Sequence, residues 1–181
     1  MRLPKIDIQK EINNNIYYLM GAVDFSKYVE NPDLYQTKSL GTNSRNIYKL
    51  LYCYAKEELS LDITNLKYRA EDGSLGSYEY DDDLIELSKA TPGSKIITLA
   101  HEIGHALIAS GSPTKYNIRY EEIIVETSAY VVLLSLGLSI TDVSYLKKKR
   151  ARAGSIEEYR DEISHISEEI LTWIYNHKNE V

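Results

Sequence analysis

The sequence TLAHEIGHALIASG, residues 98–111, places two histidines four positions apart inside an otherwise aliphatic stretch. Residues four apart project from the same face of an α-helix, so His101 and His105 can direct two imidazole nitrogens at one metal ion. We expect this helix to begin near Thr91 or Ser94 and to end at Gly111, which suits a left-handed cap. The stretch therefore predicts a buried helix with a chelating pair in its middle.

Glu102 lies next to this pair and is rotated by about 100° from His101 around the helix axis. It need not ligate the metal, yet its carboxylate can reach a water in the open coordination position, as a general base must. The alternative is a pair of histidines hydrogen-bonded within a core, with Glu102 at the surface. The aliphatic neighbours and the presence of just two further histidines, His165 and His177, favour the metal site.

A third protein ligand is expected from the next predicted helix, which runs from about Arg119 to Leu136. Glu122 and Glu126 are again four apart, and the helix is largely apolar beyond them. Burying both carboxylates is costly unless a metal or a ligand imidazole compensates them. The alternative is a pair of carboxylates hydrogen-bonded at the rim of a core, and Glu121 is expected to point away into solvent.

The remaining segments predict an α+β fold. Residues 6–22 and about 43–60 have apolar stripes at helical spacing, which predicts two helices. The C-terminal third of the chain, from about residue 141, is also predicted to be helical, with a capping box at Ser155 and Glu158. Between them, LKYRA, LGSYEY and LIELS predict three short strands. We expect a small, mainly antiparallel three-stranded sheet packed on the two-histidine helix, with further helices at both ends.

The 181 residues fit one domain, 1–181, with a core at about 43–140 and a C-terminal helical extension at about 141–178. The net charge of −6 argues against nucleic acid as the default partner. The most apolar segment, Ile123 to Leu138, is too short to span a bilayer, and the N-terminus shows no signal peptide. With its lone Cys53, the chain is expected in the cytoplasm. The basic run 147–152 is expected to be a solvated helix end.

Three stretches resemble known metallopeptidases. The HEIGH helix followed by a glutamate helix resembles the gluzincins, and GSYEYDDDLIELS resembles the strand pair before the active helix of ImmA/IrrE-like proteins. The run EEIIVETSAYVVLLSLGL is similar to the corresponding helix of ArdC-type antirestriction metallopeptidases. The resemblance covers about residues 60–140 and implies a minimal zincin fold.

The gluzincin resemblance also implies roles for the glutamates. In that group a ligand glutamate is followed four residues later by a group that orients a ligand histidine, and three further on by a small residue. Glu122, Glu126 and Ala129 match this order. The resemblance thus assigns Glu122 as the third ligand and Glu126 as the orienting carboxylate, and the equal spacing leaves the reverse assignment open.

Two histidines and a glutamate with an open fourth position suit a catalytic Zn²⁺. The expected activity is peptide-bond hydrolysis of a protein or peptide target, with Glu102 taking a proton from the attacking water. A side chain must also stabilise the oxyanion; Tyr116 and Tyr120 lie just before the third ligand, but sequence position alone does not assign this role to either. Residues 84–88 are the candidate edge strand for the substrate.

The resemblance further implies a regulatory protease associated with a phage or plasmid. The alternative is an antirestriction or regulatory binding protein of zincin fold, whose zinc is not catalytic. Glu102 separates the two, because a structural zinc needs ligands and no base. The sequence indicates no oligomeric state.

Overall fold

The computed structural model describes residues 7–24, 42–68, 70–71, 73–111, 117–140 and 143–177, without the side chains of 42–44. Within this part of the chain the elements are, in order, α1 (Ile8–Asp24), α2 (Thr42–Cys53), the π-helix η2 (Tyr54–Glu58), β1 (Asp62–Asn65), β2 (Gly76–Glu79), the 3-10 turn η3 (Tyr80–Asp82), β3 (Leu84–Leu87), α3 (Pro92–Gly111), α4 (Ile118–Ser135), α5 (Ser144–Lys148), α6 (Ala153–Glu158) and α7 (Arg160–His177). The predicted α+β class is confirmed.

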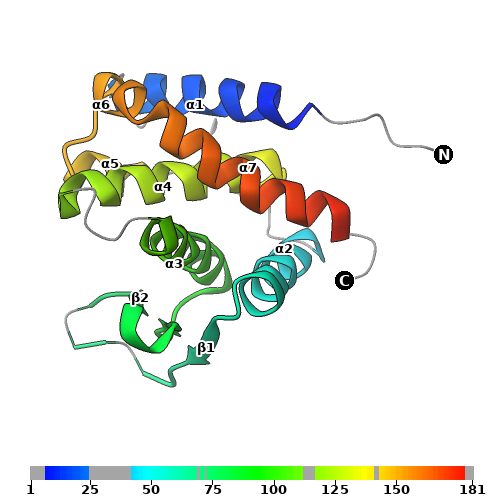
Figure 1. Ribbon diagram of the computed structural model, residues 1–181. Coiled ribbons are helices and arrows are strands. Elements are labelled where there is room, and N and C mark those ends of the chain that lie inside the picture. The colour runs from blue at the N-terminus through cyan, green and yellow to red at the C-terminus, as the bar shows by residue number, and fades with distance from the viewer. Residues whose placement is uncertain are drawn as a thin grey trace.

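The helices are stacked on one side of the small sheet (Figure 1). Helices α2 and α3 lie directly against the strands, α4 and α7 form the next layer, and α1 and α6 lie farthest from the sheet. The buried side chains form one core through these layers, including Ile12 and Leu19 of α1, Leu99 of α3, Val131 of α4 and Ile170 of α7. The position of α3 between the sheet and α4 is what places its histidines inside the molecule.

The sheet is mixed, with strand order β1-β3-β2. Strand β3 pairs in parallel with β1, from Asp62↔Leu84 to Asn65↔Leu87, and antiparallel with β2, from Gly76↔Leu87 to Glu79↔Leu84. Ile85 and Leu87 of β3 are fully buried, as their alternation with polar positions predicts. The expectation of a mainly antiparallel sheet holds for one of its two strand pairs.

The first strand lies earlier than the segment LKYRA that was expected to form it. Strand β1 is Asp62–Asn65, and the chain bends at Lys67 and Tyr68. Because β1 and β2 flank β3 on opposite sides, residues 66–75 must carry the chain from one edge of the sheet to the other. This crossover takes the residues that local β-propensity favoured for a strand.

Helix α3 is buried on nearly all sides, because the sheet, α2 and α4 all pack against it. Gly104 marks the closest approach: a Cβ built there would lie 3.0 Å from Cβ of Val125 in α4. A mid-helix glycine costs about 1 kcal/mol relative to alanine, and here it allows two helices to touch.

The C-terminal third forms three helices rather than one. Helix α6 begins at Ala153, and the Ser155 hydroxyl accepts a hydrogen bond from the Arg152 backbone N–H at 2.9 Å. The expected capping box at Ser155 and Glu158 is therefore wrong, because Ser155 already lies within the helix.

No helix of the described residues is long and apolar enough to cross a membrane.

Candidate metal site

Three side chains from α3 and α4 bring metal-binding atoms together. His101, His105 and Glu122 each offer one ligand atom, and these atoms lie within 4.8 Å of one another. The Nε2 atoms of the two histidines are 3.1 Å apart. A Glu122 carboxylate oxygen lies 3.5 Å from Nε2 of His105, and the other lies 3.8 Å from Nε2 of His101. The three residues thus form a candidate metal site.

The Nδ1 atom of each imidazole is hydrogen-bonded to a carboxylate of α4. Nδ1 of His101 lies 2.6 Å from Oε2 of Glu126, and Nδ1 of His105 lies 2.7 Å from Oε1 of Glu121. An ionised carboxylate accepts hydrogen bonds and cannot donate them, so each Nδ1 carries a proton that it donates. Both Nε2 atoms therefore point toward the same position, which faces the Glu122 carboxylate.

This donor set fits a tetrahedral divalent cation. Two nitrogens bound at about 2.0–2.1 Å around a tetrahedral centre are about 3.3 Å apart, close to the observed separation of the two Nε2 atoms. Two nitrogen lone pairs that face each other repel unless a proton or a cation lies between them. In the metal-free protein, burial lowers the pKa of His105, but hydrogen bonds that its ring donates to Glu121 and Glu122 outweigh this effect and raise the pKa to about 9, so a proton can occupy this place.

The role of Glu121 was missed at the sequence level. We expected this side chain to point into solvent, but it is largely buried and hydrogen-bonded to His105. The prediction failed because Glu121 and Glu126 project from different sides of α4, and yet each of them meets an imidazole. This is possible because His101 and His105 present their Nδ1 atoms to different parts of that helix. Carboxylates behind metal-binding imidazoles fix the ring orientation and raise ligand basicity.

The two glutamates that were predicted as ligand and orienting group occupy different sides of the imidazoles. Glu122 lies on the Nε2 side, where a metal would bind, and its pKa is lowered to about 2: burial raises it, but hydrogen bonds with His105 and Tyr145 outweigh that effect. Glu126 lies on the Nδ1 side of His101 and is 4% exposed. These positions suit ligation by Glu122 and orientation by Glu126, and the roles themselves stay predictions.

Glu102 is buried beside the candidate site, with 5% of its surface exposed. Among the described residues, no hydrogen-bond donor contacts its carboxylate, and burial raises its pKa even though His101 and His105 oppose the shift. Glu102 lines the cleft, and its oxygens are not among the fully buried atoms that lack a partner, so the carboxylate is reached by solvent from that side. Its position beside the two histidines is the one a proton acceptor for a nearby water requires.

Strand β2 packs close to Glu102 because residue 76 is a glycine. A Cβ at Gly76 would lie 2.5 Å from Cγ2 of Thr98 and 3.2 Å from Oε1 of Glu102. Thr98 cannot easily turn away, because its hydroxyl donates a hydrogen bond to the Ser94 carbonyl at 2.8 Å. Gly76 therefore lets the strand backbone approach the Glu102 carboxylate closely.

Tyr145 and Lys149 also contact the candidate site, although both lie outside residues 43–140, which the sequence predicted as the core of the domain. The Tyr145 hydroxyl, on α5, donates a hydrogen bond to Oε2 of Glu122, and the ring contacts the His101 ring edge-on with centroids 5.8 Å apart. Nζ of Lys149 lies 3.3 Å from the same Glu122 oxygen. The basic run 147–152 is thus not simply a solvated helix end. Nothing in the sequence connected these residues with a glutamate on another helix.

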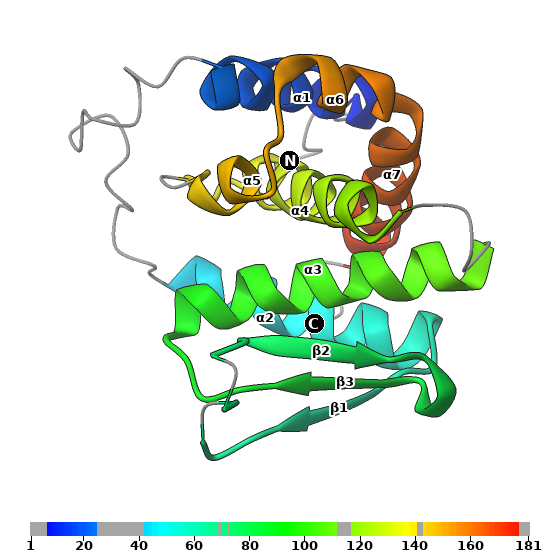
Figure 2. The same ribbon diagram turned by 90° about the vertical axis from the view of Figure 1, so that its left-hand side faces the viewer.

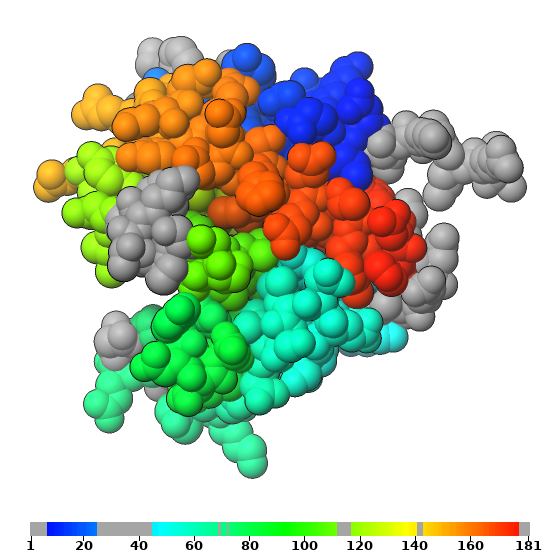
Figure 3. Space-filling view, viewed as in Figure 1, coloured from blue at the N-terminus to red at the C-terminus, as the bar shows by residue number. Residues whose placement is uncertain are grey.

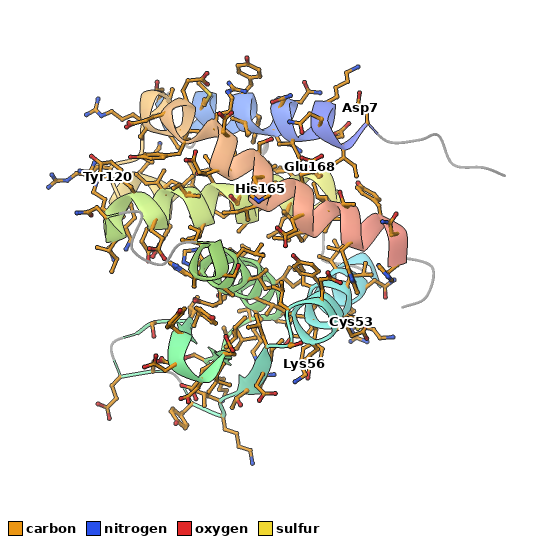
Figure 4. All side chains as sticks on the ribbon, viewed as in Figure 1. Asp7, Cys53, Lys56, Tyr120, His165 and Glu168 are labelled. Carbon is orange, nitrogen blue, oxygen red and sulfur yellow. The ribbon has the colours of Figure 1, made fainter. Side chains whose placement is uncertain are left out.

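The tyrosines considered from the sequence do not take the place of Tyr145. Tyr120, labelled in Figure 4, packs its ring against that of Tyr159, 5.4 Å away, and does not line the cleft around the metal site. Tyr116 lies outside the described residues. The two other histidines are on α7: the His165 side chain is 80% exposed, and His177 stacks on Trp173.

A cleft of about 680 Å³ gives access to the candidate site. Its lining residues come from β2, from α3 and from the starts of α4 and α5; Figure 2 shows α3 between β2 and the layer of α4 and α5. In the space-filling view the outline is hollowed on the left between these helices and the strand region below (Figure 3). Tyr80, 56% exposed, and Ile118, 75% exposed, lie on opposite walls.

The strand that borders this cleft is β2, and the expectation that residues 84–88 form the edge strand is wrong. Strand β3 is central, paired on both sides, whereas β2 pairs with β3 alone within the described residues. Ser74, Gly76 and Ser77 line the cleft. The order of strands followed from the parallel pairing of β1 with β3, which local sequence patterns do not reveal.

Comparisons with known proteins give one structural likeness to report. No protein-family model matches the chain, and no curated protein matches it in sequence. The chain aligns with the crystal structure of the Mn(II)-bound antirestriction ArdC protein from plasmid R388, with a TM-score of 0.48 and 15% identity. The alignment covers 76% of this chain and 54% of that one, so the chain spans about half the length of that protein.

Proposed function

We propose that the protein is a zinc-dependent peptidase in which Glu102 accepts a proton from the attacking water. The observation that carries this proposal is the placement of Glu102: its carboxylate has no hydrogen-bond donor among the described residues and lines the cleft beside a convergent His-His-Glu donor set. A metal held for structure alone requires the donor set and has no use for such a carboxylate.

The proposed metal is Zn²⁺, held by His101, His105 and Glu122. When bound, zinc supplies Lewis-acid activation of a water and of the scissile carbonyl. Imidazole and carboxylate ligands at the observed separations suit this ion, and Glu121 and Glu126 keep both imidazoles in the required tautomer.

The protein's own residues then have distinct tasks. The Glu102 carboxylate takes a proton from the attacking water and returns it to the leaving amine. The free edge of β2 holds the substrate backbone in an extended conformation along the cleft. Tyr145 donates its hydroxyl proton to the Glu122 carboxylate and so keeps that ligand oriented; burial and Glu122 raise the hydroxyl pKa and keep the proton in place.

The second candidate is an antirestriction or regulatory binding protein with a non-catalytic metal. The observation behind it is the name of the aligned Mn(II)-bound structure, together with the net charge of −6. In this case the protein would act by occupying the surface of a DNA-handling enzyme, and Glu102 would be dispensable.

The test compares wild-type protein with Glu102→Gln after both are loaded with zinc. Each is incubated with mixtures of candidate proteins, and new chain termini are identified by sequencing of the cleavage products. We expect cleavage by the wild type and a loss of several orders of magnitude in the variant at unchanged metal content. Cleavage of equal rate by both proteins, or by neither, would favour the binding protein.

A further inference from the structure

A second hollow, of about 410 Å³, lies at one end of the cleft. The two hollows share three lining residues, Tyr78, Tyr80 and Ala109, so they adjoin. Strand β2 and α3 run in the same direction (Figure 2), and the second hollow is lined by residues of the β2–β3 connection and of the C-terminal end of α3.

The distance from the candidate metal site is short enough for one substrate to occupy both hollows. Ala109 follows His105 by four residues of α3, which is an axial rise of about 6 Å. An extended peptide advances about 3.3 Å per residue. A substrate that lies along β2 therefore brings a side chain to the second hollow from within about two residues of the scissile bond.

The walls of this hollow combine an apolar floor with an acidic rim. Leu59, Leu61 and Ala106 supply the floor, and Leu61 is 3% exposed. Asp81 and Asp83 are exposed at the opening. A lysine or arginine side chain has this same division, because its aliphatic stem packs on apolar surface while its charged end stays near water.

No cation of the residues that the structure describes pairs with this rim. Within the described residues, neither Asp81 nor Asp83 forms an ion pair. Lys56, which lies in η2, is paired with Asp62 instead, with Nζ 2.7 Å from Oδ1. The Tyr78 hydroxyl donates a hydrogen bond to Oδ1 of Asp83 at 3.1 Å, which orients that carboxylate along the aromatic wall shared with the cleft. The charge on the rim is therefore left for a ligand.

We propose that this hollow is a specificity pocket for a lysine or arginine side chain of the peptide substrate, within about two residues of the bond to be cleaved. The inference rests on the proposed peptidase function and adds a substrate class to it. Charge complementarity at the rim and adjacency to the cleft support this occupant over an apolar side chain, for which the acidic rim would be unfavourable.

The pocket is tested by peptide binding to zinc-loaded protein carrying Glu102→Gln, which keeps bound peptides intact. Immobilised protein is incubated with a library of random, end-capped pentapeptides, and the retained pool is sequenced. We expect enrichment of lysine and arginine at one position. Adding Asp81→Asn and Asp83→Asn should lower this enrichment about two- to thirtyfold, the range for two exposed charge pairs.

Asp82→Asn in the same background is the matched control. Asp82 belongs to the same turn and is exposed, but it lines neither hollow. Enrichment should survive in this control, and should weaken at high salt. The proposal is overturned if the retained pool shows no basic preference, or if the double substitution and Asp82→Asn reduce the preference equally.

A parallel assay separates this inference from the proposed function. The enriched peptides are incubated with zinc-loaded wild-type protein, and the products are sequenced. Binding of basic peptides without their cleavage would remove the peptidase proposal and leave the pocket. Cleavage that ignores basic residues would remove the pocket and leave the peptidase.

Discussion

The Nδ1 atom of His101 lies 2.6 Å from Oε2 of Glu126, so an imidazole on α3 is oriented by a carboxylate on α4. His105 is held in the same way by Glu121, at 2.7 Å. Gly104 lets the two helices approach closely enough for both contacts. The geometry of the candidate site is therefore a property of the α3–α4 pair rather than of either helix.

Replacing His101 or His105 by alanine should abolish tight zinc binding, because each change removes one of three converging ligand atoms. At zinc about a hundredfold above the wild-type Kd, the variants should also lose a stabilisation of about 3 kcal/mol. Metal analysis and thermal unfolding with and without zinc measure both effects. His165→Ala, at an exposed site on α7, is the control and should change neither. Full zinc content in both alanine variants would remove the site.

The two glutamates should differ in the size of their effects. Glu122→Ala removes the carboxylate on the Nε2 side and should abolish tight zinc binding, whereas Glu126→Ala removes the orienting group and should weaken affinity about 10- to 100-fold. Competition with a zinc chelator measures both values. If Glu126→Ala abolishes binding while Glu122→Ala retains near-normal affinity, the ligand assignment is one helical turn out of place.

Zinc affinity and apoprotein stability should change in opposite directions with pH. The pKa of His105 is raised from its ordinary 6.5 to about 9 in the metal-free protein. The stability from the protonated form is therefore complete below about pH 6.5 and is lost as the pH rises through 9. Zinc must displace this proton, so its affinity should rise about tenfold per pH unit within the same interval.

Glu121→Gln serves as the comparison for this pH dependence. It replaces a charged acceptor of His105 by a neutral one, which should lower the His105 pKa and move both transitions to lower pH. Chemical denaturation of apoprotein and zinc titration from pH 6 to 10 provide the measurements. Curves that coincide for the wild type and this variant would exclude His105 as the group responsible.

The Glu102→Gln variant should make the apoprotein more stable at neutral and alkaline pH. Burial raises the pKa of Glu102, so the wild type loses stability as the pH rises above about 4.5 and through the raised value. The amide carries no charge and avoids this loss. Urea unfolding at pH 5 and pH 8 should show a larger gain for the variant at pH 8, and a gain that is larger at pH 5 would contradict the burial of an ionisable group.

Gly76→Ala should destabilise the protein by about 1–3 kcal/mol, the usual cost of forcing an extra methyl into a packed position. The added Cβ would overlap Thr98 and press on the Glu102 carboxylate. Gly21→Ala is the matched control, because Gly21 lies within α1 with no atom within 4 Å of its added Cβ. The control should be neutral or stabilising, by up to about 1 kcal/mol. Equal urea midpoints for the two variants would show that β2 does not pack as described.

Local periodicity was sufficient for most of the helices. The apolar stripes of α1, α3 and α4 extend over several turns, so small errors at their ends did not alter the assignment. Strand boundaries were harder, because a strand of four residues is selected by its partner as much as by its own composition. Residues 62–65 form β1 because β3 lies beside them, so the partner strand set the boundary.

The edge strand illustrates the same limit for function. Sequence order suggested that the strand just before α3 borders the cleft, but β3 became central when β1 paired with its far side in parallel. The cleft is therefore lined by β2, whose Gly76 leaves no room for a Cβ beside Thr98 and Glu102. Pairing between distant segments sets the strand order, and no local pattern contains that information.

The spacing of His101, Glu102 and His105 was determined by the sequence itself, because a helix with 3.6 residues per turn places residues four apart on one face wherever it lies. The surroundings of that motif were decided by tertiary structure alone. Glu121 reaches His105 and Tyr145 reaches Glu122 because α4 and α5 pack against α3 at particular angles and distances. Those angles depend on side-chain packing throughout the core, so contacts between helices follow from the complete fold and not from any single segment.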